Sequence, residues 1–289
     1  MQQVSRRGIQ LNMLLIGENG IGKRTFINSL CRQQYFEPET LELLGLGTTD
    51  KVELDIDTEV LDIIETDSIP IKLQISITKN FGFNVQNYSN TSMIVRFIES
   101  IYQQNLEEEQ KIVRNSKFED KRIHIGLYFI KPTGKGLNEL DIECMKLVSK
   151  RINLLPIIAK IDTLTADELT LNKKLINHDI ELNNIQVYNL CENHDQFETI
   201  DSSKEEIDYL EYIQAQLPFG IIGSNDTNPE GQLIRQNCSG IIEIENKSIC
   251  DIQLLRTVLF GSHLQELKDV TVNQKYECFR VEQLKKVKT

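Results

Sequence analysis

Residues 17–25 read Gly-Glu-Asn-Gly-Ile-Gly-Lys-Arg-Thr, one residue away from the loop that binds nucleotide phosphates, G-x-x-x-x-G-K-[ST]. Gly17, Gly22 and Lys23 occupy the required positions, whereas Arg24 stands where the pattern has Ser or Thr. The stretch therefore predicts the shape of a phosphate-binding loop and leaves open whether its chemistry is retained.

The residue types of this loop each have a physical role. Glycines let successive backbone N–H groups converge on phosphate oxygens at the N-terminus of the next helix, and the lysine ammonium neutralises the phosphates. The hydroxyl after the lysine binds Mg²⁺, which Arg24 cannot do because a guanidinium has no acceptor lone pair. Thr25 lies about 100° further round the helix, where its hydroxyl could still reach an α-phosphate. We therefore expect no Mg²⁺ ligand at the usual position.

The flanking sequence favours a true loop over a chance match. Residues 11–16 form a nearly continuous apolar run, which is typical of a buried parallel strand. After the loop, Phe26, Ile27 and Leu30 repeat at helical spacing. Strand, glycine loop and helix in this order are the setting that the motif requires.

Length and composition indicate an ordinary globular protein. The chain has 289 residues, of which 40% are hydrophobic and 26% charged, and a net charge of −11. The negative charge disfavours binding to nucleic acid or to anionic membranes by the molecule as a whole. No apolar run approaches the about 18 residues of a membrane span, and the N-terminus is unlike a secretory signal, so we expect an intracellular protein. The six cysteines include no C-x-x-C pair, which argues against a zinc site or a disulfide framework.

Hydrophobic patterning predicts a doubly wound α/β sheet. Capping boxes at Thr165–Glu168 and Ser203–Glu206 predict the starts of two helices. The other expected helix spans residues 91–109, and the expected strands are 11–16, 52–56, 71–77, 123–130, 154–159, 185–190 and 219–223. We expect one compact domain over about residues 8–270, an N-terminal arm at 1–7 and a helical C-terminal extension at 271–289.

Two further segments bear on nucleotide chemistry. Lys160 and Asp162 follow the strand at 154–159, where an aspartate can accept both donors of a guanine edge and a lysine stem can lie along the base. A solvated surface pair is the alternative. A D-x-x-G motif is expected after the strand that begins at 71, but Ile77 and Asn80 stand at its Asp and Gly positions. The metal-orienting carboxylate and the glycine that senses a γ-phosphate are both missing.

Four separated blocks carry a resemblance to a known family. They are Arg114-Asn115 with residues 118–120 and 122–124, then 132–137, then 221–225, then 240–246 running into Leu255-Arg256 and His263-Leu264. On these blocks the chain resembles the septins, filament-forming relatives of the small GTPases, and most of all fungal subunits with a degenerate catalytic site. The likeness runs from Arg6 to Arg280.

The resemblance implies a P-loop NTPase fold, similar to that of small GTPases, with a septin-unique element of β-meander and helices at about 225–270. It implies base contacts from Gly223 through its backbone and from Arg235 by stacking. The residues it assigns to nucleotide binding are Gly17, Asn19, Gly20, Ile21, Gly22, Lys23, Arg24, Thr25, Lys160, Asp162, Gly223 and Arg235.

The chain departs from the septin pattern at several positions besides Arg24, Ile77 and Asn80. The first-switch threonine has only Thr48 and Thr49 as candidates. Residues 237–240 read Asn-Cys-Ser-Gly where the family has Tyr-Pro-Trp-Gly, and Lys135 stands where a histidine commonly reaches a neighbour's nucleotide. One of the two septin interfaces is therefore expected to be altered or unused.

Two functions remain open at this point. The first is a septin filament subunit that assembles with other septins at the cell cortex, as in a septin ring or division site, and binds GDP or GTP weakly, statically or not at all, without Mg²⁺. The second is a slow GTPase switch. We find no catalytic residues, because no histidine, cysteine or carboxylate stands at catalytic or metal-ligand spacing. Arg6 and Arg7 could contact phosphoinositides or form a solvated terminus.

Arg24 itself permits two arrangements. Its guanidinium could lie bidentate on a β-phosphate, which favours a static diphosphate complex that does not depend on metal. Alternatively, its side chain fills the phosphate space and leaves the site empty.

Overall fold

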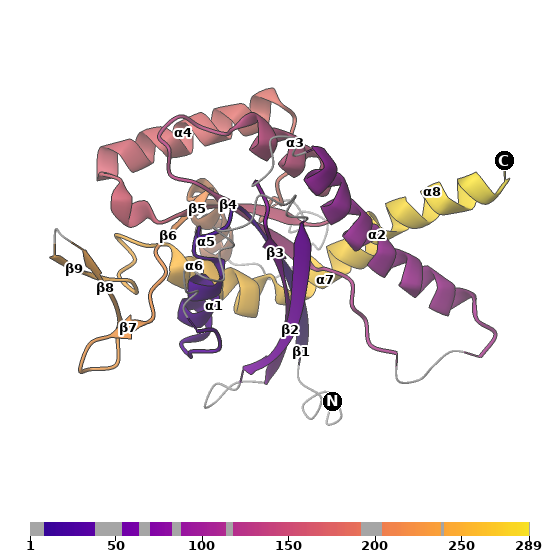
Figure 1. The fold of residues 1–289 in the computed structure, drawn as a ribbon, viewed down its shortest axis with the longest axis horizontal. Coiled ribbons are helices and arrows are strands. Elements are labelled where there is room, and N and C mark those ends of the chain that lie inside the picture. The colour runs from indigo at the N-terminus through magenta and orange to yellow at the C-terminus, as the bar shows by residue number, and fades with distance from the viewer. Residues whose placement is uncertain are drawn as a thin grey trace, which may run out of the picture.

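A computed structural model describes residues 9–37, 54–63, 70–82, 88–113, 118–191, 204–237 and 240–288. The predicted N-terminal arm, residues 1–7, lies outside these ranges. Six strands form the main sheet in the order β2-β3-β1-β4-β5-β6 (Figure 1). The strands are β1 (Ile9–Ile16), β2 (Asp55–Ile63), β3 (Ile71–Lys79), β4 (Ile125–Ile130), β5 (Leu154–Ala159) and β6 (Phe219–Ile221).

Five of these strands are parallel, and β2 alone runs antiparallel, beside β3. The central strands β4 and β5 are buried along their whole length, which explains their continuous apolar runs. Helices on both faces make this a doubly wound sheet, as predicted (Figure 1). They are α1 (Lys23–Cys31), α2 (Tyr88–Gln110), α3 (Glu139–Val148), α4 (Ala166–Leu182) and α5 (Lys204–Ala215).

The C-terminal part adds a small sheet and a chain of helices. The three-stranded antiparallel sheet β7-β8-β9 confirms the predicted meander and lies at the opposite end of the molecule from α8 (Figure 1). Its strands and the segments that follow are β7 (Asp226–Thr227), β8 (Leu233–Asn237), β9 (Gly240–Glu243), α6 (Ile252–Thr257), η4 (Val258–Ser262), α7 (Leu264–Val270), η5 (Thr271–Tyr276) and α8 (Glu277–Lys288).

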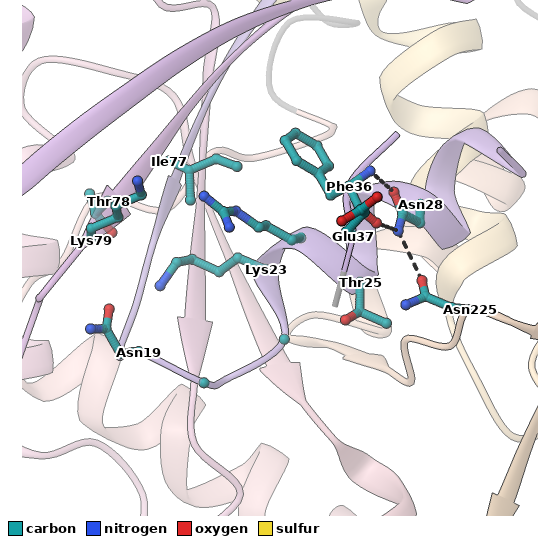
Figure 2. Close-up of a pocket in the computed structure, with 13 residues that line it drawn as sticks. Asn19, Lys23, Thr25, Asn28, Phe36, Glu37, Ile77, Thr78, Lys79 and Asn225 are labelled. Atoms are coloured by element: carbon teal, nitrogen blue, oxygen red, sulfur yellow. Dashed lines mark hydrogen bonds between the residues drawn. The ribbon is translucent and has the colours of Figure 1, made fainter. Parts of the chain in front are cut away.

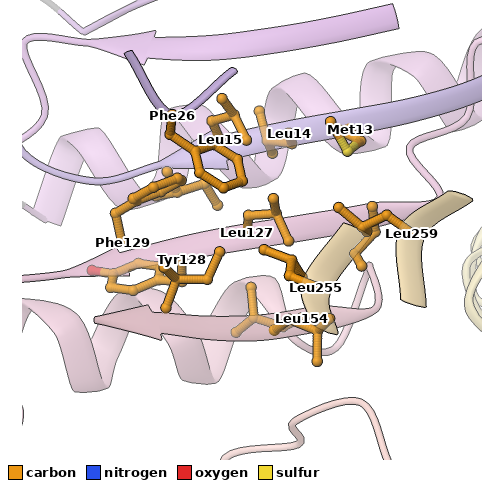
Figure 3. Packing of buried hydrophobic residues seen from close by; sticks show 14 of the residues in the cluster. Met13, Leu14, Leu15, Phe26, Leu127, Tyr128, Phe129, Leu154, Leu255 and Leu259 are labelled. Atoms are coloured by element: carbon orange, nitrogen blue, oxygen red, sulfur yellow. The ribbon is translucent and has the colours of Figure 1, made fainter. Parts of the chain in front are cut away.

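The hydrophobic core joins these two parts. Figure 3 shows Leu255 of α6 and Leu259 of η4 beside Leu127 of β4 and Leu154 of β5. All four side chains are fully buried. The septin-like C-terminal element therefore completes the core of the main sheet.

Two strand predictions differ from the structure. The strand expected at 52–56 is β2, which begins at Asp55 and runs to Ile63. It is an edge strand whose middle is exposed and polar, so hydrophobic alternation marks it poorly. The prediction of a strand at 185–190 is wrong. Among the described residues, β6 is the strand that pairs with β5 on this side. The segment 185–190 makes one backbone hydrogen bond to β5, from Tyr188 N to Leu154 O at 2.9 Å. Its apolar residues are buried as a core-covering loop instead.

The helix predictions agree with the structure within a few residues. The helix expected at 91–109 is α2. Thr165 caps α4 and forms the predicted capping box with Glu168. A helix does follow the second capping box, although Ser203 itself lies outside the described residues.

Helix α8 packs against α2 through aromatic side chains. The Tyr102 ring of α2 lies 5.6 Å from the Tyr276 ring and 5.5 Å from the Phe279 ring. Phe279 is 1% exposed. Arg151 forms ion pairs with both helices. Its Nε lies 2.9 Å from the Glu99 carboxylate of α2, and a second guanidinium nitrogen lies 2.7 Å from the Glu282 carboxylate of α8. The predicted boundary near residue 270 therefore falls inside a continuously packed region.

A buried polar network ties β1 to β4 and to the C-terminal helices. Asn12 N donates to His124 Nδ1 at 3.0 Å, and the Asn153 amide donates to His124 O and Leu267 O. His124 is 4% exposed. Since Nδ1 accepts, the neutral ring carries its proton on Nε2. Burial lowers the pKa of His124 to about 4. Asp120 opposes this shift, whereas Lys268 and Arg122 add to it.

This histidine predicts a loss of stability in mild acid. The folded pKa is depressed, so the unfolded chain binds the proton more readily, and the stabilisation present above pH 6.5 is lost as the pH falls toward about 4. The free energy of unfolding should fall by up to about 1.4 kcal/mol per pH unit in this window. Urea titrations of the wild type and His124→Asn at several pH values measure this. If the free energy of unfolding depended equally on pH in the two proteins, His124 would not be the group that takes up a proton on unfolding.

Candidate nucleotide-binding site

The glycine loop lies at the carboxyl end of β1 and leads directly into α1. A Cβ on Gly17 would stand 2.8 Å from Phe129 Cβ, so only glycine allows the loop to approach β4 this closely. Gly22 caps α1 with a φ of 103°, a left-handed conformation that favours glycine. The local sequence thus produces the phosphate-loop geometry at the topological switch of the sheet, between β1 and its neighbours β3 and β4.

Lys23 is folded back onto its own loop. Its Nζ donates to Gly17 O at 2.6 Å and to Glu18 O at 2.8 Å, and the residue is buried. In Figure 2 its side chain runs between Ile77 and Asn19. The ammonium that would neutralise phosphate therefore has backbone oxygens around it in this conformation.

Arg24 contacts the strand next to the loop. Its guanidinium lies 3.6 Å from the Asp57 carboxylate of β2 and over the Phe36 ring, 5.8 Å from the centroid. Lys79 also pairs with Asp57. Asp57 is the register partner of Ile77 in the β2–β3 ladder, so two cations share a carboxylate beside Ile77.

The side chains beside Arg24 are poor ligands for a Mg²⁺ ion. Arg24, Ile77, Lys23 and Lys79 line the same cavity of about 260 Å³ (Figure 2). Mg²⁺ requires oxygen ligands, and here three cationic side chains and the apolar Ile77 line the cavity beside the phosphate loop, with Glu37 as the carboxylate of the lining. No cluster of metal-binding side chains occurs among the described residues.

Asn28 organises the segment after α1. Its Oδ1 accepts from the backbone N–H groups of Tyr35 and Phe36, and its Nδ2 donates to Phe36 O and to Asn225 Oδ1 (Figure 2). Asn28 is 4% exposed. This side chain fixes the Phe36 ring beside Arg24 and joins α1 to the segment after β6.

A second cavity of about 180 Å³ adjoins the loop on the β5 side. Lys160 spans it, donating to Gly20 O at 2.7 Å. Asp162 accepts from the Asn237 amide at 3.1 Å, and Arg235 Nε lies 3.9 Å away from it. Gly223 approaches α1 so closely that a Cβ would stand 3.2 Å from Phe26 N.

The structure brings the predicted site residues together in these two cavities. Thr25, Gly20 and Gly22 line both. The first also contains Asn19, Lys23 and Arg24, and the second also contains Ile21, Lys160, Asp162, Gly223 and Arg235. Gly17 contributes through its carbonyl contact with Lys23. Their roles in nucleotide binding stay predictions.

Three contacts of the site were not predicted from sequence. They are the ion pair of Arg24 with Asp57 and the hydrogen bonds of Asn28 with Asn225 and of Asn237 with Asp162. Each joins segments that are distant in the chain. Only the departure from Tyr-Pro-Trp-Gly at Asn237 gave a local signal. Of the other named positions, Arg6, Arg7, Thr48, Thr49, Arg114, Asn115, Cys238 and Ser239 lie outside the described residues.

The fold and the loop define a P-loop protein with the fold of the GTPases. The family model described as Septin matches residues 7–289. Cell division control protein 11 of Saccharomyces cerevisiae is 37% identical over 96% of this chain and 67% of its own. Septin homolog spn3 of Schizosaccharomyces pombe is 36% identical over 97% of this chain and 74% of its own. The crystal structure of Cdc11 from Saccharomyces cerevisiae superposes with a TM-score of 0.61 at 30% identity, covering 95% of this chain and 100% of that one.

The chain belongs to the septin family. Membership supports the predicted role as a septin filament subunit with other septins as partners, and a place among the septins of the cell-division cytoskeleton. Among the described residues, no helix combines the length and the hydrophobicity needed to span a bilayer.

Proposed function

We propose that this septin is a structural subunit of hetero-oligomers and filaments whose nucleotide site binds GDP or GTP weakly or not at all and does not hydrolyse GTP. The observation that carries the proposal is that the side chains expected to bind a nucleotide make hydrogen bonds to other groups of the same chain. Lys23 and Lys160 donate to loop carbonyls, and Asp162 accepts from Asn237. A nucleotide would have to replace each of these bonds, so its net gain is small.

The alternative function, a slow GTPase switch, is disfavoured by the same region. Phosphoryl transfer depends on metal and on charge-stabilising groups at the β- and γ-phosphates. Here Arg24 replaces the metal-binding hydroxyl, and Ile77 is 4% exposed and presents a methyl surface beside it. We therefore assign no catalytic residue.

The position of Arg24 favours the second of the two arrangements proposed for it. Its guanidinium is held between a carboxylate and an aromatic ring on the side of β2, where it helps to fill the cavity beside Ile77. A bidentate contact with a β-phosphate would require it to leave Asp57. Calorimetry with GDP, with and without Mg²⁺, distinguishes the arrangements, because the bidentate one predicts tight binding in both.

Cortical localisation and a weak contact of Arg6 and Arg7 with phosphoinositides also belong to this proposal, as does the absence of nucleic-acid binding. Their support is the septin family and the net charge of −11. Binding to vesicles with and without phosphoinositide, by the wild type and by a variant with both arginines changed to Ala, tests the membrane contact.

Assembly gives the direct test of the scaffold role. The C-terminal element is intact and forms part of the core, so we expect the chain to join hetero-oligomers chiefly through the face built from its N- and C-terminal elements. Sedimentation of mixtures with partner septins should show complexes larger than either component. A chain that stays monomeric with every partner septin would overturn the proposal.

A further inference from the structure

We propose that Asn19 and Asn80 form an internal clasp that holds the phosphate loop against the end of β3 whatever the ligand, so that this septin cannot report the presence of a γ-phosphate. The inference deepens the proposed function, and it rests on that function only in taking the site to be of the guanine-nucleotide type. The two bonds themselves do not depend on any ligand.

The clasp consists of two reciprocal hydrogen bonds. The Asn80 backbone N–H donates to Asn19 Oδ1 at 2.8 Å, and Asn19 Nδ2 donates to Asn80 Oδ1 at 3.1 Å. Both amide orientations are determined, since each side chain would lose its bond on flipping. Figure 2 shows the Asn19 side chain directed from the loop toward the end of β3, near Thr78 and Lys79.

The bond at the Asn80 backbone is the important one. Asn80 stands at the position where the septin pattern has the glycine that offers its N–H to a γ-phosphate. Here that N–H donates to a side chain of the same protein. Asn80 has a φ of 60°, a left-handed conformation that asparagine tolerates better than most residues, so the backbone keeps a glycine-like shape without a glycine.

The residues after Asn80 hold this segment in place. Phe81 is 1% exposed, and its ring packs edge-on against Tyr128 at 6.3 Å. A Cβ on Gly82 would stand 3.2 Å from Glu18 Cγ, so the chain passes close to the loop residue next to Asn19. Three consecutive residues thus contact either the core or the phosphate loop.

This arrangement removes the basis of a switch. A ligand shifts a conformational equilibrium only by its difference in affinity for the two states. A γ-phosphate that accepted a hydrogen bond from the Asn80 N–H would displace Asn19 Oδ1 from it. One hydrogen bond would thus be exchanged for another. The diphosphate and triphosphate forms therefore leave the end of β3 in the same position.

Hydrogen exchange of the Asn80 backbone amide tests the clasp in the protein without added nucleotide. We expect Asn19→Ala to speed this exchange about tenfold, which corresponds to the loss of about 1.4 kcal/mol of protection. Asn19→Asp keeps the acceptor and should preserve the protection. Asn184, which also has a positive φ of 52° but is remote from the site, provides the control Asn184→Gly, which should leave the amide of residue 80 unchanged.

A second set of measurements adds GDP or a non-hydrolysable GTP analogue at equal concentration. The clasp predicts the same exchange rate at Asn80 in both. An unchanged rate in Asn19→Ala, with the amides of β1 showing that the variant is folded, would overturn the proposal. Slower exchange with the GTP analogue than with GDP would overturn it too. Tight nucleotide binding with an unaltered clasp would instead refute only the weak-binding part of the proposed function.

Discussion

Arg24→Ser is expected not to restore GTP hydrolysis. Serine would return one Mg²⁺ ligand and release Asp57 from its contact with the guanidinium. The ion would still face Ile77, which is buried and apolar, and the backbone N–H of Asn80 would still donate to Asn19. Losing one well-placed stabiliser of transition-state charge typically lowers the rate by about 10²–10³, and two remain lost in this variant.

Single-turnover release of phosphate from GTP measures this. The comparison is between Arg24→Ser and the triple variant that also carries Ile77→Asp and Asn80→Gly, with the wild type as the baseline. We expect release at the baseline rate from the single variant and a rate at least about 10²-fold higher from the triple variant. Turnover by Arg24→Ser alone would mean that the changes at the second switch are harmless and that the chain is a GTPase with one defect.

Phe279→Ala is expected to lower the free energy of unfolding by about 3–5 kcal/mol. The side chain is 1% exposed and packs against Tyr102 of α2, and Arg151 lies over its ring at 5.9 Å. Truncation would leave a cavity between α2 and α8. Urea denaturation monitored by circular dichroism measures the change.

Val281→Ala is the matched control, because it removes an apolar side chain that is 45% exposed on the same helix. Its effect should stay within about 0.5 kcal/mol, as for other surface substitutions. If Phe279→Ala were as mild as the control, the helical extension predicted at 271–289 would be only loosely attached, and its packing on α2 would contribute little to the stability of the fold.

The fold was predictable from sequence where the signal is local. The apolar run before the loop, the glycines of the loop and the spacing after it all lie within a few residues, and they correspond to β1 and α1. The predicted bounds of strand β2 differ from the observed ones because an edge strand exposes much of its surface and needs no apolar alternation. Residues 185–190 were mistaken for a strand because a buried loop has the same apolar composition as a short strand.

For the site, too, only the features with a local sequence signal could be predicted. The loop and the residues after β5 could be named from their motifs, and the structure places them around adjoining cavities. The contacts that satisfy these residues internally could not be named. Asn237 meets Asp162 across 75 positions of sequence, and Asn80 meets Asn19 across 61, so no local pattern predicts either pair.

Nucleotide content tests the central claim most directly. The purified protein is denatured, and the nucleotide in the supernatant is quantified by ion-exchange chromatography. Because the site's lysines and aspartate are bonded within the chain, we predict much less than one guanine nucleotide per protein chain, with no change when a chelator is present during purification. One guanine nucleotide per chain, lost on adding the chelator, would contradict the account and identify a working, Mg²⁺-dependent GTPase site.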